Sequence, residues 1–335
     1  MPKKFDLAKF RREHDTVMEQ GVGRTTDIVI PADGRRRIMG PTGVGKSTFV
    51  NNVLSELGVR TKPANTSNGF KSCTDQLAHY IVDVPKLLSD LHPKVKGRRL
   101  VLVDTPGFDD TNLSDSEILR RIAVWLASSY DSKMRVGGVV YLFPIYPNHI
   151  TRNDRSNIKI FQRLCGQNSL TKIILATTRW DICPPEAGES RELELRTNFW
   201  SDMLPQEESE GALLARLENT PESALGIIHR ILERYFDQHE VADMNENIDG
   251  IILKMQDQLV RRNKILPETD AARELRRKLE ELMKESRGGD PTKRKERLQR
   301  LVAQAKDLKI PLGKRIMGIF GMVGLINFIR GERQS

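Results

Sequence analysis

Residues 40–48 read Gly40-Pro41-Thr42-Gly43-Val44-Gly45-Lys46-Ser47-Thr48 and match the pattern G-x-x-x-x-G-K-[ST] at every fixed position. In this pattern the glycines let the backbone amides of the loop approach a polyphosphate, and the lysine neutralises its outer phosphates. The serine offers a hydroxyl to Mg²⁺, and the expected helix directs its positive end at the anion. The alternative is a glycine-rich turn before a helix, and four matched positions make it the weaker interpretation. Residues 42–48 are therefore predicted to form a phosphate-binding loop.

A second motif follows an apolar run. Residues 100–103, Leu-Val-Leu-Val, lead into Asp104-Thr105-Pro106-Gly107, a D-x-x-G pattern. A carboxylate at the end of a buried strand beside the phosphate-loop strand can hold Mg²⁺ through water, and the Gly107 amide can sense a γ-phosphate. An ordinary turn is the alternative. After a phosphate loop, we interpret Asp104 and Gly107 as parts of the same site.

Thr74 is the candidate for the switch threonine, whose hydroxyl closes on Mg²⁺ when a triphosphate is bound. It lies in a polar stretch suited to a loop. The spacing alone favours this role no more than that of an ordinary loop threonine.

The base-reading candidate is Thr178-Arg179-Trp180-Asp181, which follows the apolar run Ile173-Ile174-Leu175-Ala176. A carboxylate at this strand end can accept hydrogen bonds from guanine N1–H and its exocyclic amine, a pattern that adenine lacks. Arg179 could stack its planar guanidinium on the base. The T-x-x-D tetrapeptide is a weak signal alone, and its position after a strand strengthens it.

Short apolar runs alternate with amphipathic segments between about residues 27 and 236, which is typical of an α/β fold. Strands are expected at 78–82, 99–103, 138–143, 172–177 and 213–217. Helical patterns cover 117–129 and 156–164, and Thr220-Pro221 opens another helix with threonine as N-cap. The predicted fold is a three-layer P-loop NTPase with a mainly parallel sheet, followed by a C-terminal helical extension.

Composition limits the class of protein. Three cysteines and six histidines show no paired or metal-ligand spacing, so we expect neither a disulfide framework nor a zinc site. Residues 1–26 mix acids and bases without an apolar stretch, which predicts a mobile arm and not a secretory signal. These features favour an intracellular, cytoplasmic protein.

Strand signals stop after residue 240, and the 335-residue chain carries its net charge of +9 in the part that follows. Residues 261–315 hold 18 Lys and Arg against 9 Asp and Glu, and the rest of the chain balances. Helical patterns at 251–265, around 272–282 and around 298–308 surround a Gly288-Gly289 break, which predicts a coiled-coil-like hairpin. The expected organisation is an arm over 1–26, a G domain over 27–240, a basic helical extension over 241–315 and an apolar tail over 316–335.

The tail contains a 14-residue apolar run at 316–329, short of the ~20 residues that cross a bilayer. Two interpretations remain: a peripheral membrane anchor helped by the basic hairpin, and a segment that packs on the G domain or on a partner helix through residues 310–335. Interleaved acids and bases favour the second. No aromatic interleaving points to nucleic acid.

Together the motifs resemble the septin-like P-loop GTPases, which include immunity-associated GTPases and chloroplast-import receptor GTPases, with fungal G domain-containing proteins as the nearest likeness. The resemblance rests on residues 39–48, 104–112, 116–122, 138–142, 161–166, 177–181 and 220–224. It covers about 27–240 and implies GTP or GDP as ligand, Mg²⁺ held by Ser47, Thr74 and Asp104, and Asp181 as guanine reader. A homodimer through the G domain is consistent with it.

Three departures from the usual pattern carry expectations. Thr178 and Arg179 stand where Asn and Lys are commonest, so guanine selectivity is expected to be looser. Phe108 follows Gly107 where many signalling GTPases carry a water-orienting Gln, so hydrolysis should be slow or need a residue from a partner. Residues 31–38, with arginines at 35–37 that suit a buried central strand poorly, separate the apolar Ile28–Ile30 from the loop. Either Ile28–Ile30 pairs elsewhere and a stub at Ile38-Met39 carries the loop, or residues 31–38 are an insertion.

The predicted function is a GTP-binding switch or assembly module with slow Mg²⁺-dependent hydrolysis. Lys46, Thr74 and Gly107 are the candidate catalytic residues. The alternatives are a P-loop ATPase or kinase-like enzyme and a non-hydrolysing GTP-binding scaffold.

Overall fold

The computed structural model describes residues 28–30, 44–59, 78–84, 86–104, 108, 114–131, 135–146, 150–204, 211–237, 252–285 and 291–307. The strands are β1 (Ile28–Ile30), β2 (Ala78–Asp83), β3 (Arg99–Asp104), β4 (Arg135–Val136), β5 (Val139–Pro144), β6 (Ile173–Thr178) and β7 (Leu213–Arg216). The α-helices are α2 (Lys46–Glu56), α3 (Lys86–Leu91), α4 (Asp115–Asp131), α5 (Arg152–Cys165), α6 (Pro185–Glu194), α7 (Pro221–Asp237), α8 (Lys254–Gln256), α9 (Asp270–Glu285) and α10 (Pro291–Asp307). The five predicted strands are confirmed to within a residue at most boundaries.

Strand β1 occupies an inner position in its sheet, which bears on the first of the two alternatives for residues 28–38. It pairs in parallel with β3 on one side and with β4 on the other. The order of this sheet is β2-β3-β1-β4, and β2 runs antiparallel to β3. Ile28–Ile30 therefore does not pair elsewhere: it forms the strand beside the Asp104 strand, where a phosphate loop should begin. Residues 31–43 lie outside the described part of the chain.

Strands β5, β6 and β7 form a second, all-parallel sheet in that order. Because β4 ends at Val136 and β5 begins at Val139, one extended stretch connects the two sheets. Every residue of β5 and β6 is buried, as expected for parallel strands covered on both faces.

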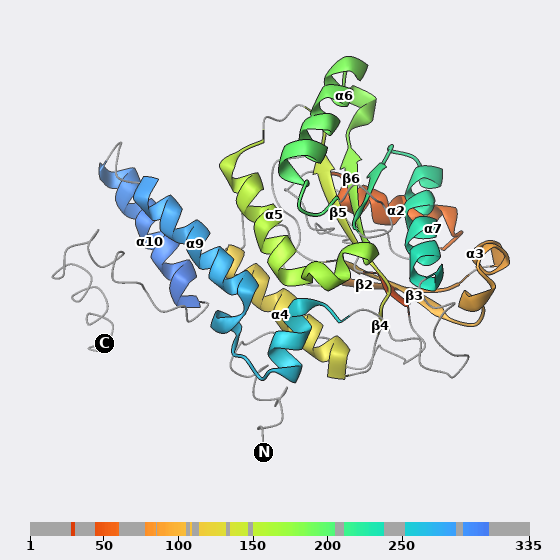
Figure 1. Ribbon diagram of the computed structural model, residues 1–335, viewed down its shortest axis with the longest axis horizontal. Helices are drawn as coiled ribbons and strands as arrows, with labels where there is room; N and C mark the ends of the chain where they lie inside the picture. Colours follow the sequence, from red (N-terminus) through yellow and green to blue (C-terminus); the bar gives the residue numbers. More distant parts are fainter. Residues whose placement is uncertain are drawn as a thin grey trace.

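Helices cover both faces, giving the predicted three layers (Figure 1). Alternate strand residues face different cores: Val140 and Leu142 join one with α2, α3 and α7, while Tyr141 and Phe143 join the other with α4 and α5. Both cores also include residues of β3, so the layers run continuously across the two sheets. The α/β P-loop architecture is confirmed.

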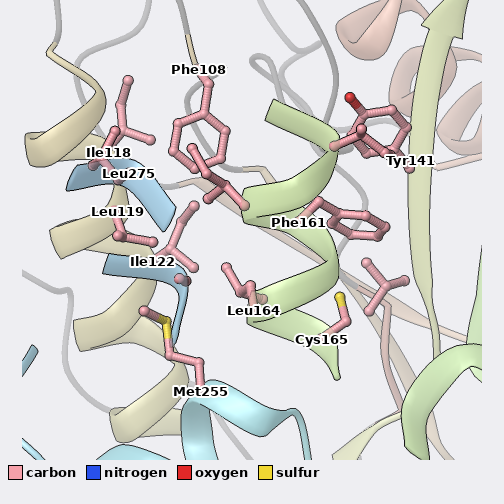
Figure 2. Close-up of a cluster of buried hydrophobic side chains, with 14 of the residues drawn as sticks. Phe108, Ile118, Leu119, Ile122, Tyr141, Phe161, Leu164, Cys165, Met255 and Leu275 are labelled. Atoms are coloured by element: carbon pink, nitrogen blue, oxygen red, sulfur yellow. The ribbon is translucent and has the colours of Figure 1, made fainter. Parts of the chain in front are cut away.

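The segment after residue 252 shares the core of the α/β part. Helices α8 and α9 pack on α4 and α5, and α10 lies against both α4 and α9 (Figure 1). Figure 2 shows Leu275 of α9 and Met255 of α8 beside Ile118, Ile122 and Leu164. The domain boundaries stay a prediction, but α9 buries its apolar side against the α/β layers.

The predicted hairpin of two helices is present as α9 and α10, which begin and end close to the expected residues. The expected helix over 251–265 is shorter. Its α-helical turn at Lys254–Gln256 continues as a π-helical turn over Asp257–Arg261. Asn263 adopts a left-handed conformation with φ 51°, which ends the helix before Ile265.

No helix in the described part of the chain is long and apolar enough to cross a membrane. The apolar run at 316–329 and the arm at 1–26 lie outside the described residues.

Candidate nucleotide-binding site

A cavity of about 130 Å³ opens where three chain segments meet. Its lining comes from the start of α2, from the loop after β6 and from the loop after β7. The lining residues are Val44, Gly45, Thr48, Phe49, Asn52, Thr178, Arg179, Asp181, Leu217, Glu218 and Asn219. Because β6 and β7 are parallel, their carboxyl ends meet at one edge, and α2 begins at the same edge.

The phosphate-loop side has the backbone that an anion site needs. Gly45 adopts φ 93° as the N-cap of α2, and a Cβ there would meet nothing within 4 Å, so this position needs glycine for its conformation. Gly45, as the N-cap, has no side chain with which to cap α2, and the first turn of the helix holds no acidic residue. The amides of the first turn are therefore available to an anion.

Lys46 is 2% exposed, and Ser47 and Thr48 are half-buried. Lysine is almost never buried without a partner, and Lys46 has interactions within the protein. Lys46 and Ser47 flank the cavity in sequence without lining it. Thr42 and Gly43 lie outside the described residues.

Thr178 connects the base-reading loop to the phosphate loop. Its hydroxyl donates a hydrogen bond of 2.8 Å to the carbonyl oxygen of Val44, and both residues are buried. The Thr178 carbonyl oxygen accepts from the Ile145 amide at 2.9 Å. Two predicted halves of the site, 134 residues apart in sequence, are thus in direct contact.

The base-reading loop has an unusual backbone. Arg179 adopts the left-handed conformation with φ 65°, which costs a residue with a Cβ about 1–2 kcal/mol. Asp181 follows in a single 3-10 turn over Trp180–Ile182, is exposed, and lines the cavity together with Arg179. The predicted guanine reader is therefore accessible to a ligand.

The third wall, Leu217 to Asn219, was not predicted as part of the site. Glu218 donates its amide to the Ser223 hydroxyl at 3.0 Å, and Thr220 caps α7 by accepting from the Ser223 amide at 3.2 Å. The sequence held one signal for this wall: residues 217–219 lie at the end of an expected strand and precede the helix that Thr220 caps. Loops after parallel strands line the ligand crevices of α/β folds.

The metal side is described in part. Asp104 is the last residue of β3, opposite Ala78 of β2 and two positions beyond Leu102, which pairs with Ile30 of β1. The carboxyl end of the Asp104 strand therefore lies beside the end of β1. Thr74 and Gly107 lie outside the described residues, so their roles stay predictions.

Phe108 lies in the core. It is 3% exposed, and its ring lies among the buried side chains between α4 and α5 (Figure 2). The position where many signalling GTPases carry a water-orienting Gln is therefore occupied by a side chain that contacts helices.

Comparison with known proteins finds one matching family. Residues 37–190 are similar to the AIG1 family. The chain is a GTP-binding protein of the P-loop GTPase type. No curated protein matches it.

Three solved structures resemble the chain at low identity. Toc33 from Arabidopsis thaliana in complex with Mg²⁺ and GMPPNP matches at 16% identity, covering 69% of this chain and 91% of that one, with a TM-score of 0.44. The chloroplast translocon components atToc33 and psToc159 match at 18% identity, covering 62% and 83%, with a TM-score of 0.44. Elongation factor SelB from Methanococcus maripaludis matches at 11% identity, covering 66% and 35%, with a TM-score of 0.37.

Proposed function

We propose that this GTPase is a nucleotide-dependent switch or assembly module that hydrolyses GTP slowly with Mg²⁺. The observation that carries the proposal is the single cavity lined by the start of α2 and by Asp181. A polyphosphate at the α2 terminus and a purine beside Asp181 would then belong to one ligand. We assign the chain to the wider septin-like group on the same motifs.

Different groups bind the phosphate end and the base end of the nucleotide in this proposal. Lys46 and the amides of residues 43–48 hold the phosphates, because buried cations and helix N-termini bind anions strongly. Asp181 accepts from guanine N1–H and the exocyclic amine, and adenine would leave this acceptor unpaired. Arg179, next to it, lines the same cavity and supports the base.

The residues present fit Mg²⁺. Ser47, in the uncapped first turn of α2, and Asp104, at the end of the neighbouring strand, are oxygen donors of the kind that Mg²⁺ prefers. Thr74 would complete the set. When bound, the ion neutralises charge on the β- and γ-phosphates.

Slow hydrolysis follows from the burial of Phe108. A phenyl ring cannot orient water, and this one lies among the helices, so this position supplies no water-positioning group. A second copy of the chain, docked through the G domain, would supply the missing residue in trans. Turnover per molecule should then rise with protein concentration. No turnover at any concentration would favour the non-hydrolysing scaffold.

Titration with fluorescent GDP, GTP and ADP tests the binding site. We expect tight guanine-nucleotide binding, a loss of affinity in Lys46→Ala, and a shift towards xanthine nucleotides in Asp181→Asn. Equal affinity for ADP and GDP in the wild type would instead favour the ATPase or kinase-like alternative. An unaltered base preference in Asp181→Asn would refute the role of Asp181.

We place the protein in the cytoplasm, with its tail docked on protein and not on lipid. Co-sedimentation with anionic liposomes, with and without residues 310–335, distinguishes the two. Equal pelleting of both chains would agree with protein docking, and tail-dependent pelleting would favour the peripheral membrane anchor.

A further inference from the structure

Trp180 stands between Arg179 and Asp181, two of the residues that line the cavity. It precedes Asp181 in the loop after β6, and its ring contacts three elements. Its indole N–H donates to the carbonyl oxygen of Thr177 at 3.1 Å and to the Thr177 hydroxyl at 3.0 Å. That hydroxyl also lies 3.3 Å from the carbonyl of Ala215 on β7.

Arg216 of β7 covers a face of the same ring. The guanidinium carbon of Arg216 lies 4.2 Å from the centre of the Trp180 ring, a cation–π contact. Arg216 is oriented by Glu192 of α6 through a two-pronged ion pair, with hydrogen bonds of 3.1 and 2.7 Å to Oε2. Arg216 directly precedes Leu217, where the third wall of the cavity begins.

Two further contacts close this arrangement. The Thr177 carbonyl that accepts from Trp180 also accepts from the Leu217 amide at 2.8 Å, so a single oxygen connects both loops. On α6, a Cβ added to Gly188 would lie 2.6 Å from Cζ3 of Trp180, so the ring occupies the space that a side chain there would take.

We propose that Trp180, clamped between Thr177, Arg216 and Gly188, is a positioning residue that holds Asp181 in its base-reading geometry and thereby sets the preference for guanine over adenine. Asp181 is exposed and follows the left-handed Arg179 on a short 3-10 turn, so the turn itself does little to hold the carboxylate. Where only a fraction of the molecules adopts the binding geometry, the apparent dissociation constant rises in inverse proportion to that fraction. Phosphate binding depends on α2 and is separate from this clamp.

The inference rests on the proposed nucleotide site, and the experiment compares dissociation constants for GDP and ADP across variants. Trp180→Ala and Arg216→Ala remove the two partners of the stack. Gly188→Ala removes no group, yet displaces the ring. Trp180→Phe keeps a smaller aromatic ring for the stack and loses the N–H. This variant should fold, because the Thr177 carbonyl still accepts from the Leu217 amide and the Thr177 hydroxyl still donates to the Ala215 carbonyl.

We expect Trp180→Ala and Arg216→Ala to reduce the ADP-to-GDP ratio of dissociation constants by about tenfold, within the twofold to thirtyfold range of a cation–π contact. The affinity for ADP should stay within about twofold, since phosphate binding is unchanged. Gly188→Ala should reduce the ratio as well, and Trp180→Phe should reduce it less than Trp180→Ala.

Arg155→Ala is the matched control. The Arg155 guanidinium carbon lies 4.9 Å from the centre of the Phe199 ring, so this substitution removes a similar cation–π contact. Neither Arg155 nor Phe199 is among the described residues that line the cavity. Its ratio should equal that of the wild type.

The outcomes separate the two proposals. If Asp181→Asn abolishes the guanine preference while the Trp180, Arg216 and Gly188 variants retain it, the positioning role is wrong and the nucleotide site stands. If the wild type shows no guanine preference, both are wrong. Equal losses for GDP and ADP in the Trp180 and Arg216 variants would indicate general damage and overturn the positioning role.

Discussion

Lys278 of α9 is the most informative residue to change outside the cavity. It is 2% exposed, and its ammonium donates to Oδ2 of Asp115 at 2.7 Å and to Oδ1 of Asn157 at 2.9 Å. These acceptors belong to α4 and α5 and are themselves buried. Replacing Lys278 with Met keeps the length and the apolar stem and leaves the Asp115 carboxylate buried without its cation.

Breaking a buried ion pair from one side costs about 3–5 kcal/mol. Since whole domains are stable by about 5–15 kcal/mol, this loss would be a large part of the total. At about 2–4 °C per kcal/mol, the melting temperature should fall by roughly 6–20 °C. Urea unfolding followed by circular dichroism measures the free energy, and a thermal scan checks the temperature.

Lys284→Met is the matched control, because Lys284 lies on the same helix and is exposed. Its effect should stay within about 0.5 kcal/mol. The double variant Asp115→Asn with Lys278→Met should be more stable than Lys278→Met alone, because it buries no unpaired charge. If Lys278→Met lowers the free energy of unfolding by less than about 1 kcal/mol, the buried contact of Lys278 with Asp115 and Asn157, and the docking of α9 on α4 and α5, are refuted.

Four further outcomes follow from single contacts. Thr178→Val removes the hydrogen bond to the carbonyl of buried Val44, so it should lower the free energy of unfolding by about 1–3 kcal/mol and weaken GDP binding. Thr197→Val is the control: it loses an exposed hydrogen bond of 2.9 Å to Leu193 and should change neither quantity. Phe108→Gln should destabilise the fold by about 2–4 kcal/mol without speeding single-turnover hydrolysis; faster turnover would contradict the buried position of Phe108. Burial tends to raise the pKa of Asp270, but hydrogen bonds from Lys254 and Gln258 together with nearby positive charge outweigh it and lower the pKa. The wild type should therefore be more stable than Asp270→Asn above the unfolded pKa of about 4. This difference in stability should vanish as the pH falls through the lower pKa of the folded state. Burial raises the pKa of the Cys165 thiol, so mass mapping after iodoacetamide should find Cys165 unlabelled in the native protein and labelled in urea.

The strands were predictable because parallel strands buried on both faces read as continuous apolar runs. Residues 173–176 and 139–143 carry this signal, and each became a fully buried strand. The partners of β1 were not predictable, since three residues give no register and residues 31–38 separate them from the phosphate loop. Pairing with β3 and β4 is a tertiary property that a local pattern does not contain.

The docking of α9 could not be read from its charge. Basic residues dominate the segment, which predicted a basic helical extension, and its helical pattern showed an apolar face without indicating what covers it. Lys278 is one residue before Leu279, at the edge of that face, where lysine is ordinarily exposed. Only the positions of Asp115 and Asn157 on two other helices make its burial favourable. Likewise, Asp181 was predictable from its motif, but its wall partners at 217–219 were not.

Thr178 also bears on how much of the base preference the loop itself can supply. A threonine hydroxyl has one proton to donate, and here the Val44 carbonyl takes it. An asparagine at this position could donate two protons, one to the phosphate loop and one to a ligand. Thr178 therefore preserves the connection between the two loops and offers no donor to a bound base. Under the proposed assignment, discrimination between guanine and adenine falls to Asp181, so the geometry of that carboxylate, and the Trp180 clamp beside it, should matter more here than in a loop with asparagine.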